Sequence, residues 1–377
     1  MRLIAAAAAA VLLGACANIG SPPGGPTRTE PPRIVSITPD SGAVNVRAGE
    51  VTFAFDAVVS DRPASAASLE ALFLISPRDG TPRVSWERSR IEVRPRRGFR
   101  PNTAYSVTLL PGVADLRGNA SRESRTVIFS TGATIPPYAI RGRAFDWMAE
   151  RPAPGALIEV VRASDSLVYV GIADSLGQFA VGPLESGRYT ARAIMDNNRN
   201  SALDANEPWD SVGVTVREVS PFIELLAAPR DTIGPRILTT EARDSLTLVL
   251  RFDRPLDPAV PLTPASFRVL AADSTRLAVA RVTLRAPVVA ADSVPASDTT
   301  ARPTSRIVIP RPSSRAPTTI VTLSLDPATP LRTGASYRIV AVNARGLLGV
   351  LRTSDREITA ELRAPADSAR AVPPLTR

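Results

Sequence analysis

The chain has 377 residues and a formal net charge of +9, and all of its basic side chains are arginine because it contains no lysine and no histidine. Without histidine there is no Ser-His-Asp triad and no histidine metal site, and without lysine there is no Schiff base or Ser-Lys dyad. Its single cysteine excludes an intramolecular disulfide. The composition still allows hydrolysis by a pair of catalytic carboxylates, but no pair of Asp or Glu residues lies in a recognisable motif.

The N-terminus carries a targeting signal. Arg2 precedes an apolar run, Leu3–Leu13, which is followed by Gly14, Ala15 and Cys16. A positive start, a short apolar stretch and small residues before a cleavage point are typical of export signals. The run is shorter than the roughly 20 apolar residues that cross a bilayer, so we do not expect it to be a membrane span.

This segment resembles bacterial lipoprotein signals, in which cysteine is the first residue after cleavage. The resemblance implies that residues 1–15 are removed and that Cys16 carries a covalent lipid, which anchors the protein to a membrane. Ala17 in place of aspartate favours the outer membrane. The alternative is an ordinary secretory signal with a chance cysteine. Nucleic acid is not an expected partner of an exported chain, whereas its basic charge favours anionic surfaces.

Residues 16–31 are expected to be the lipidated N-terminus and a flexible tether, because they are rich in Pro, Gly, Ser and Thr. Residues 32–133 are expected to form a first β-sandwich. Val51, Phe53 and Phe55 alternate with small or polar residues, which is typical of strands with one buried face. The expected strands are 33–37, 51–55, 72–76, 83–87, 90–94, 105–109 and 127–129.

The first unit resembles the bacterial Ig-like domains of S-layer and other surface proteins. The likeness rests on PPRIVSITPDSGAVNV, VTFAFD, FRPNTAYSVTLLPGVADLRGN and VIFSTG, which cover nearly the whole segment. It implies a sandwich without a disulfide, in agreement with the missing cysteines. Tyr105 is expected either to bond nearby backbone at a corner of the sandwich or simply to pack in the core.

Residues 138–228 are expected to form a second sandwich, with strands at 140–145, 157–162, 168–173, 178–181, 189–195, 212–216 and 222–227. The run APGALIEVV…ADSLGQFAVGPLESGRYTARAI resembles transthyretin-like domains of the carboxypeptidase-regulatory and carbohydrate-binding-like type. The resemblance implies an accessory module without catalysis. In that pattern Asp174, Gly177 and Phe179 form a tight turn and a core anchor, and Gly187 and Tyr189 lead the returning strand.

Residues 233–363 are expected to form a divergent Ig-like repeat of the first unit. LRTGASYRIVAVNARGLLG mirrors FRPNTAYSVTLLPGVADLRGN, which places Tyr337 where the first unit has Tyr105. Residues 286–317 are rich in Pro, Ser, Thr, Asp and Arg, and we predict a disordered insertion there with a short strand at Ile307–Ile309. A disordered tail is expected at 364–377. The expected fold class is therefore all-β, with tandem sandwiches.

The sharpest motif is DNNRNSALDANE, residues 196–207. Oxygen-bearing side chains stand at positions 1, 3, 5, 9 and 12 of this loop, the spacing with which a twelve-residue loop wraps Ca²⁺. The expected calcium ligands are Asp196, Asn198, Asn200, the Ala202 carbonyl, Asp204 and Glu207.

Two departures weaken the calcium prediction. Ser201 occupies the sixth position, where glycine is expected for the sharp turn, and the flanking segments are expected to be strands rather than helices. Two amide ligands and few charges imply a dissociation constant of about 10⁻⁴–10⁻³ M. The alternative is an Asx-rich turn that bonds its own backbone.

Two further features are candidate ligand sites. A cluster of four arginines beside Phe99 is either a docking patch for anionic glycan or lipid, or a solvated strand end; it consists of Arg94, Arg96, Arg97 and Arg100. Trp147 and Trp209 are the candidates for stacking on a sugar ring, and the alternative for each is a place in the core or as a lid.

The sequence therefore predicts a non-catalytic, lipid-anchored envelope protein with a structural, adhesion or assembly role. Its expected partners are the membrane, through the lipid, and an envelope glycan or another envelope protein. The alternative is a carbohydrate-binding lipoprotein that uses its middle domain, although fold alone does not fix function.

Overall fold

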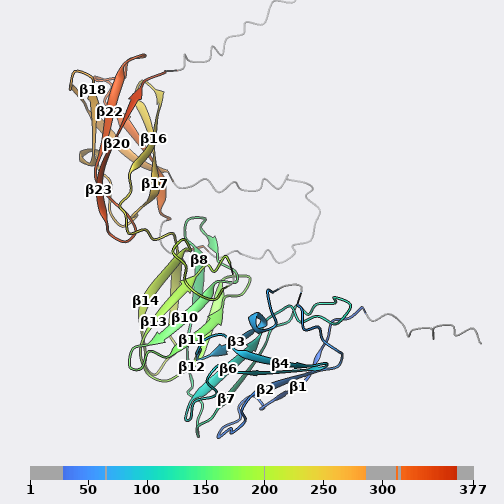
Figure 1. Cartoon of the computed structure of the whole chain (residues 1–377). Coiled ribbons are helices and arrows are strands. Elements are labelled where there is room, and N and C mark those ends of the chain that lie inside the picture. Colours follow the sequence, from blue (N-terminus) through green and yellow to red (C-terminus); the bar gives the residue numbers. More distant parts are fainter. Residues whose placement is uncertain (1–28, 64–65, 199, 286–310, 313–315, 363–377) are drawn as a thin grey trace, which may run out of the picture.

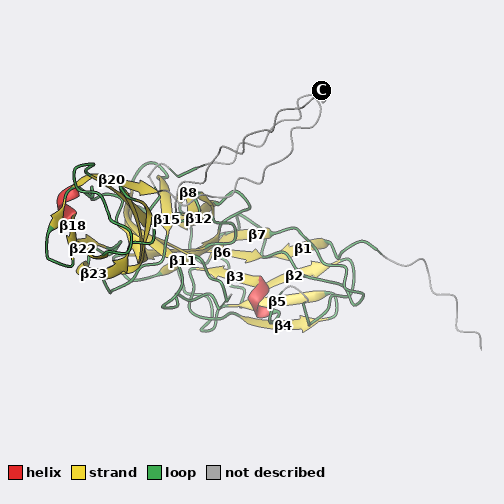
Figure 2. Cartoon of the chain, turned by 90° about the horizontal axis from the view of Figure 1, so that it is seen from above, coloured by secondary structure: helices red, strands yellow, loops and turns green. Residues whose placement is uncertain are grey.

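A computed structural model describes residues 29–63, 66–198, 200–285, 311–312 and 316–362. The described chain is built of strands, and it forms three β-sandwiches in succession, with the second between the other two (Figure 1). The predicted all-β class of tandem sandwiches is confirmed. In the part of the chain that the structure describes, helix is confined to two short 3-10 turns, Glu70–Leu72 in the first sandwich and Pro264–Ser266 in the third (Figure 2). The predicted signal, most of the tether, Ile307–Ile309 and the tail lie outside the described residues.

The first sandwich has a four-stranded and a three-stranded sheet. Alternating side chains of both sheets meet in one core that includes Phe53, Tyr105 and Phe129. The first sheet has the order β1(Ile34–Thr38), β2(Val51–Phe55), β5(Arg90–Arg94), β4(Arg83–Glu87), and the second has β3(Phe73–Ser76), β6(Ala104–Leu109), β7(Arg125–Ser130).

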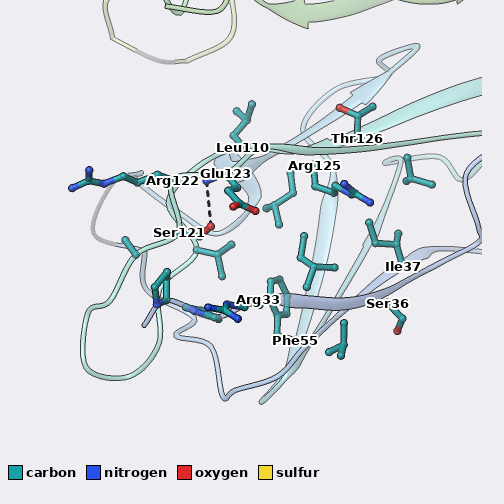
Figure 3. A pocket seen from close by; sticks show the side chains of 18 of the residues that line it. Arg33, Ser36, Ile37, Phe55, Leu110, Ser121, Arg122, Glu123, Arg125 and Thr126 are labelled. Carbon is teal, nitrogen blue, oxygen red and sulfur yellow. Dashed lines mark hydrogen bonds between the residues drawn. The ribbon is translucent and has the colours of Figure 1, made fainter. Parts of the chain in front are cut away.

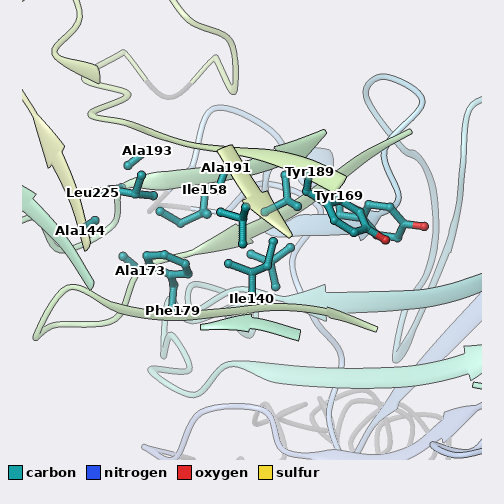
Figure 4. Close-up of a cluster of buried hydrophobic side chains, with 14 of the residues drawn as sticks. Ile140, Ala144, Ile158, Tyr169, Ala173, Phe179, Tyr189, Ala191, Ala193 and Leu225 are labelled. Carbon is teal, nitrogen blue, oxygen red and sulfur yellow. The ribbon is translucent and has the colours of Figure 1, made fainter. Parts of the chain in front are cut away.

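The second sandwich packs two four-stranded sheets. One has the order β11(Val168–Ile172), β10(Leu157–Arg162), β13(Gly187–Ile194), β14(Trp209–Val216); the other has β12(Gln178–Leu184), β8(Tyr138–Asp146), β15(Phe222–Ala227), with β9(Arg151–Pro152) paired to β8. Figure 4 shows side chains from both sheets meeting in its core, among them Ile140, Ile158 and Leu225.

The expected tight turn of the second sandwich is present. Asp174 Oδ1 accepts backbone N–H groups from Leu176 and Gln178, and Phe179 is buried directly after the turn. Gly177 has φ +73°, and a Cβ atom there would lie 2.4 Å from the carbonyl oxygen of Ala144. The turn therefore requires glycine at this position for both its backbone conformation and its space.

The third sandwich repeats the strand order of the first. One sheet has the order β16(Ile237–Asp244), β17(Thr247–Leu256), β21(Thr318–Leu325), β20(Val279–Arg285), and the other has β19(Arg276–Leu277), β18(Phe267–Ala271), β22(Ser336–Arg345), β23(Leu351–Thr359). In both units a 3-10 turn precedes the first strand of the second sheet. Strand β19 is an addition that the first sandwich lacks.

Several strand boundaries differ from those expected. We expected a strand at 212–216, but β14 begins at Trp209, because all eight residues from Trp209 to Val216 pair in register with β13. We expected the insertion in the third unit to end near 317, but Ala316 is already buried in the sandwich. Pairing with β13 sets the first of these limits and burial against the sandwich sets the second, and neither contact is encoded in a local pattern.

One ion pair and several hydrogen bonds tie the first and second sandwiches together. The Arg78 guanidinium lies 2.5 Å from a carboxylate oxygen of Glu159, which is buried and also lies 3.6 Å from Arg192. The Arg78 N–H donates to the carbonyl of Val168, and the Val170 N–H donates to the Ser76 hydroxyl. These bonds join the end of β3 to the edge of β11, so the two sandwiches meet along a strand edge as well as through side chains.

The connection to the third sandwich is held from both sides. Arg230 lies 2.5 Å from Asp210 of the second sandwich and donates to the carbonyl of Trp209. The next residue along the chain, Asp231, pairs with Arg254 of the third sandwich. Adjacent residues of the connecting segment are thus bonded to the second and to the third sandwich.

Candidate functional sites

The predicted lipidation residue, Cys16, lies outside the described residues, so the anchor stays a prediction. No helix in the described ranges is long and apolar enough to span a membrane.

The loop 196–207 connects β13 to β14 and closes on its own polar side chains. Asp196 accepts the backbone N–H groups of Asn200 and Ser201, and Glu207 accepts those of Asn197 and Asp204. These bonds place the first and last carboxylates of the loop at its centre, facing inward.

Two of the remaining predicted ligands, Asn198 and Asn200, bond to a third, Asp204, whereas Ala202 donates its N–H to Asn200 Oδ1. The side-chain amides of Asn198 and Asn200 both donate to Asp204 Oδ2, at 2.6 and 2.9 Å. Ser201, at the position where a calcium loop has glycine, adopts φ +58°. The left-handed turn that glycine serves in such loops is therefore present despite the serine.

Within the described residues, no group of three or more His, Cys, Asp or Glu side chains is arranged to hold a metal ion. The carboxylates of the loop instead accept N–H groups, as an Asx-rich turn does. Calcium binding thus stays a prediction. Arg78 adds a contact that the sequence pattern could not supply, since its guanidinium donates to the carbonyl of Ser201 at 2.6 Å from across the junction.

The arginine cluster lies at one end of the first sandwich, and its backbone is well fixed. Asp79 accepts the N–H groups of Arg96 and Arg97, and Phe99 packs edge-on against Tyr105. All four predicted arginines, Arg94, Arg96, Arg97 and Arg100, are exposed.

Sequence reasoning missed one member of this cluster. Arg83 on β4 lies directly opposite Arg94 on β5, a like-charge pair that is unfavourable across two strands. Acidic groups share this face, however, since Glu92 is two residues from Arg94 on β5. Burial, together with the nearby carboxylates of Glu50 and Glu87, raises the pKa of Glu92. The face is therefore mixed in charge, since it carries the carboxylates of Glu92 and its neighbours as well as the arginines.

The tryptophans are held by the protein itself. The ring of Trp209 has the guanidinium groups of Arg192 and Arg230 at 5.6 and 5.4 Å from its centre. Trp147 is partly buried in a turn and donates its backbone N–H to Ala227. Trp86 is 38% exposed, and its indole N–H bonds the carbonyl of Val59. The contacts of Trp209 favour a structural role over sugar stacking.

A cavity of about 890 Å³ lies along the open seam of the first sandwich between β1 and β7. Figure 3 shows Ile37 and Phe55 on one side of this seam and Arg125 and Thr126 on the other. Its lining combines the sandwich interior with exposed charges of both signs, and its polar groups do not converge on one point. A second cavity lies between the first and second sandwiches.

The first sandwich belongs to a known class of domain. Residues 28–131 match the family described as bacterial Ig-like domain, which confirms the predicted resemblance for this unit. The likeness of the second unit to transthyretin-like domains is not tested by this match and stays a prediction. No curated protein sequence matches the chain.

Solved structures show weak likenesses. The N-terminal part of the bacterial S-layer protein SbsC is 19% identical with a TM-score of 0.24, over 36% of this chain and 25% of that one. An L,D-transpeptidase from Mycobacterium smegmatis is 20% identical with a TM-score of 0.20, over 50% and 74% of the two chains. The Bacillus anthracis TIE protein is 10% identical with a TM-score of 0.18, over 91% and 57%. The chain thus spans a quarter of the SbsC fragment, and none of these likenesses carries a conclusion about activity.

Proposed function

We propose that the protein is a non-catalytic lipoprotein of the bacterial envelope, in which Cys16 carries the lipid and three sandwiches form a structural or binding module. The observation that carries this proposal is an N-terminal segment that resembles a lipoprotein signal and ends in the only cysteine, followed by a match of residues 28–131 to the bacterial Ig-like domain family. Ala17 after the cysteine, in place of aspartate, supports an outer-membrane location.

The ion pairs at both junctions support a spacer role. Arg78 and Glu159 hold the first sandwich to the second, and Arg230 and Asp231 hold the connection to the third. A module whose units keep a set geometry presents its surfaces at a defined distance from the anchor.

Metabolic labelling with a radioactive fatty acid tests the anchor. We expect label in the wild-type protein and in a Ser21→Ala control, and none in Cys16→Ser. We also expect wild-type protein in the outer-membrane fraction and the Cys16→Ser variant in the soluble fraction. Unlabelled wild-type protein, or a Cys16→Ser variant that still sediments with the membrane, would contradict the proposed anchor.

We propose in addition that the loop 196–207 binds calcium weakly. The support is the inward placement of the carboxylates of Asp196 and Glu207 and the left-handed backbone of Ser201. Binding would exchange the N–H partners of these carboxylates for the ion.

A further inference from the structure

We propose that the groove between the first and second sandwiches binds an acidic oligosaccharide, one whose sugars carry carboxylate groups. The groove has a volume of about 660 Å³ and is lined by both units. That size suits a small ligand, and such sites occur preferentially where domains meet. This inference deepens the proposed binding role of the module by naming a ligand class and a place.

One wall is a row of hydroxyl groups on the outer face of the first sandwich. Strands β6 and β7 turn Tyr105, Val107 and Val127 into the core, so Thr108 and Thr126 lie on the opposite face. The hydroxyls of these two threonines are 2.8 Å apart. Ser106 and Ser124 line the same wall. Hydroxyl groups both donate and accept hydrogen bonds, as the hydroxyls of a sugar do.

The opposite wall comes from the outer face of β8 and β12 and includes Arg141. Tyr138 also lines the groove, but it packs against the core of the second sandwich. Arg141 is exposed, and among the described residues it has no carboxylate in an ion pair. Its neighbours on the adjoining strands are Ala180 and Phe222, neither of which has a charge.

The one carboxylate on the lining belongs to Asp174, and its Oδ1 atom is engaged by the N–H groups of the tight turn. Arg141 therefore adds a planar guanidinium group to a groove whose other wall carries hydroxyl groups. Its N–H groups bind a carboxylate best, because two of them can donate to the two carboxylate oxygens at once.

An acidic peptide is a less suitable occupant than a sugar. An extended peptide gains most of its affinity by adding to an open strand edge. The edge of β11 beside the groove is already used, since Val168 and Val170 bond Arg78 and Ser76. What the groove offers is side-chain hydroxyls and one cation.

Calorimetric titration of the mature chain carrying Cys16→Ser, with tetragalacturonate as the acidic probe and maltotetraose as the neutral probe, tests the proposal. We expect saturable binding of the acidic probe and at least about tenfold weaker binding of the neutral one. Arg141→Gln should weaken tetragalacturonate binding about tenfold, and the double variant Thr108→Val/Thr126→Val about fivefold. Arg188→Gln removes the same charge from an exposed position outside the groove and should leave binding unchanged.

Thermal melts of each variant without ligand separate lost binding from lost folding. The proposal is overturned if tetragalacturonate does not bind, if both probes bind equally, or if Arg141→Gln binds like the wild type while remaining folded. Tighter binding of a polyglutamate peptide than of tetragalacturonate, abolished by Arg141→Gln, would overturn it in favour of a peptide site. Because the titration uses unlipidated protein, its outcome is independent of whether Cys16 is the anchor.

Discussion

Tyr105 and Tyr337 accept the same hydrogen bond in the first and third sandwiches. The hydroxyl oxygen of each lies 2.8 Å from the backbone nitrogen of the residue five positions earlier, Arg100 in one case and Arg332 in the other. Both rings are buried. Of the two readings open for Tyr105, the corner bond is confirmed, and the ring packs in the core as well.

This bond makes the corner a contributor to stability. We expect Tyr105→Phe and Tyr337→Phe each to lower the free energy of unfolding of its own sandwich by about 1 kcal/mol, because each loses one intramolecular hydrogen bond at little cost in packing. Urea unfolding of the full chain, followed by domain-resolved hydrogen exchange, measures this. Tyr138→Phe is the control, since its ring packs against the core of the second sandwich without a hydrogen bond of its hydroxyl among those of the described residues; an equal loss there would contradict the assignment.

The second sandwich should weaken in alkali. Burial raises the pKa of Tyr169 to about 12, and burial also raises the pKa of its neighbour Tyr189. The unfolded chain releases these protons near pH 10, so the stabilisation is complete below that pH and is lost as pH rises towards 12. We expect a loss of about 2–3 kcal/mol for Tyr169 over this window.

Chemical unfolding between pH 9 and pH 12 measures the alkaline loss, and the absorbance of the phenolate reports the titration directly. Tyr169→Phe should reduce the slope of stability against pH. A slope that the variant leaves unchanged would show that other groups cause the loss.

The junction of the first two sandwiches should depend on the pair of Arg78 and Glu159. Removing one partner leaves the other largely buried, so we expect Arg78→Ala or Glu159→Gln alone to cost about 1–3 kcal/mol. In the double variant the two losses should not add, because the partners share one interaction. Urea unfolding gives the energies, and small-angle X-ray scattering should show a wider range of interdomain angles. Strict additivity, or scattering identical to the wild type, would argue against this role.

Calcium should stabilise the second sandwich if the loop 196–207 binds it. With a dissociation constant of about 10⁻⁴ M, a hundredfold excess of calcium adds about 2.7 kcal/mol to the folded state. We expect the melting temperature to be higher in calcium than in EDTA for the wild type and for the control Asn206→Ala. The melting temperature of Asp196→Ala/Glu207→Ala should be the same in both. If the wild type has the same melting temperature in calcium and in EDTA, the loop does not bind calcium and is only an Asx-rich turn.

The sequence predicted the parts of the fold that depend on local alternation. Val51, Phe53 and Phe55 point into the core as their period of two requires, and the turn at Asp174 forms from its own Asx chemistry. The hydrogen bond of the tyrosine corner could also be predicted from the sequence, because its donor lies only five residues before Tyr105.

Features that depend on two distant segments could not be predicted. Arg78 and Glu159 are 81 residues apart, and nothing near either one identifies the other as its partner. Thr108 and Thr126 have the pattern of an ordinary solvent face, and they became part of a candidate site only because the second sandwich lies over them. The relative placement of domains, which no local pattern encodes, decides such sites.

The pairing of β15 with β8 has a mechanical consequence. These are the last and first strands of the second sandwich, and they run parallel over six residue pairs, from Phe222 beside Arg141 to Ala227 beside Asp146. The chain thus enters the sandwich at one pole and leaves it at the other. Tension applied between the cell and whatever the far end holds would pull these two strands in opposite directions along their length. All the bonds between them would then bear the load together in shear, an arrangement that resists force far better than opening the strands one bond at a time.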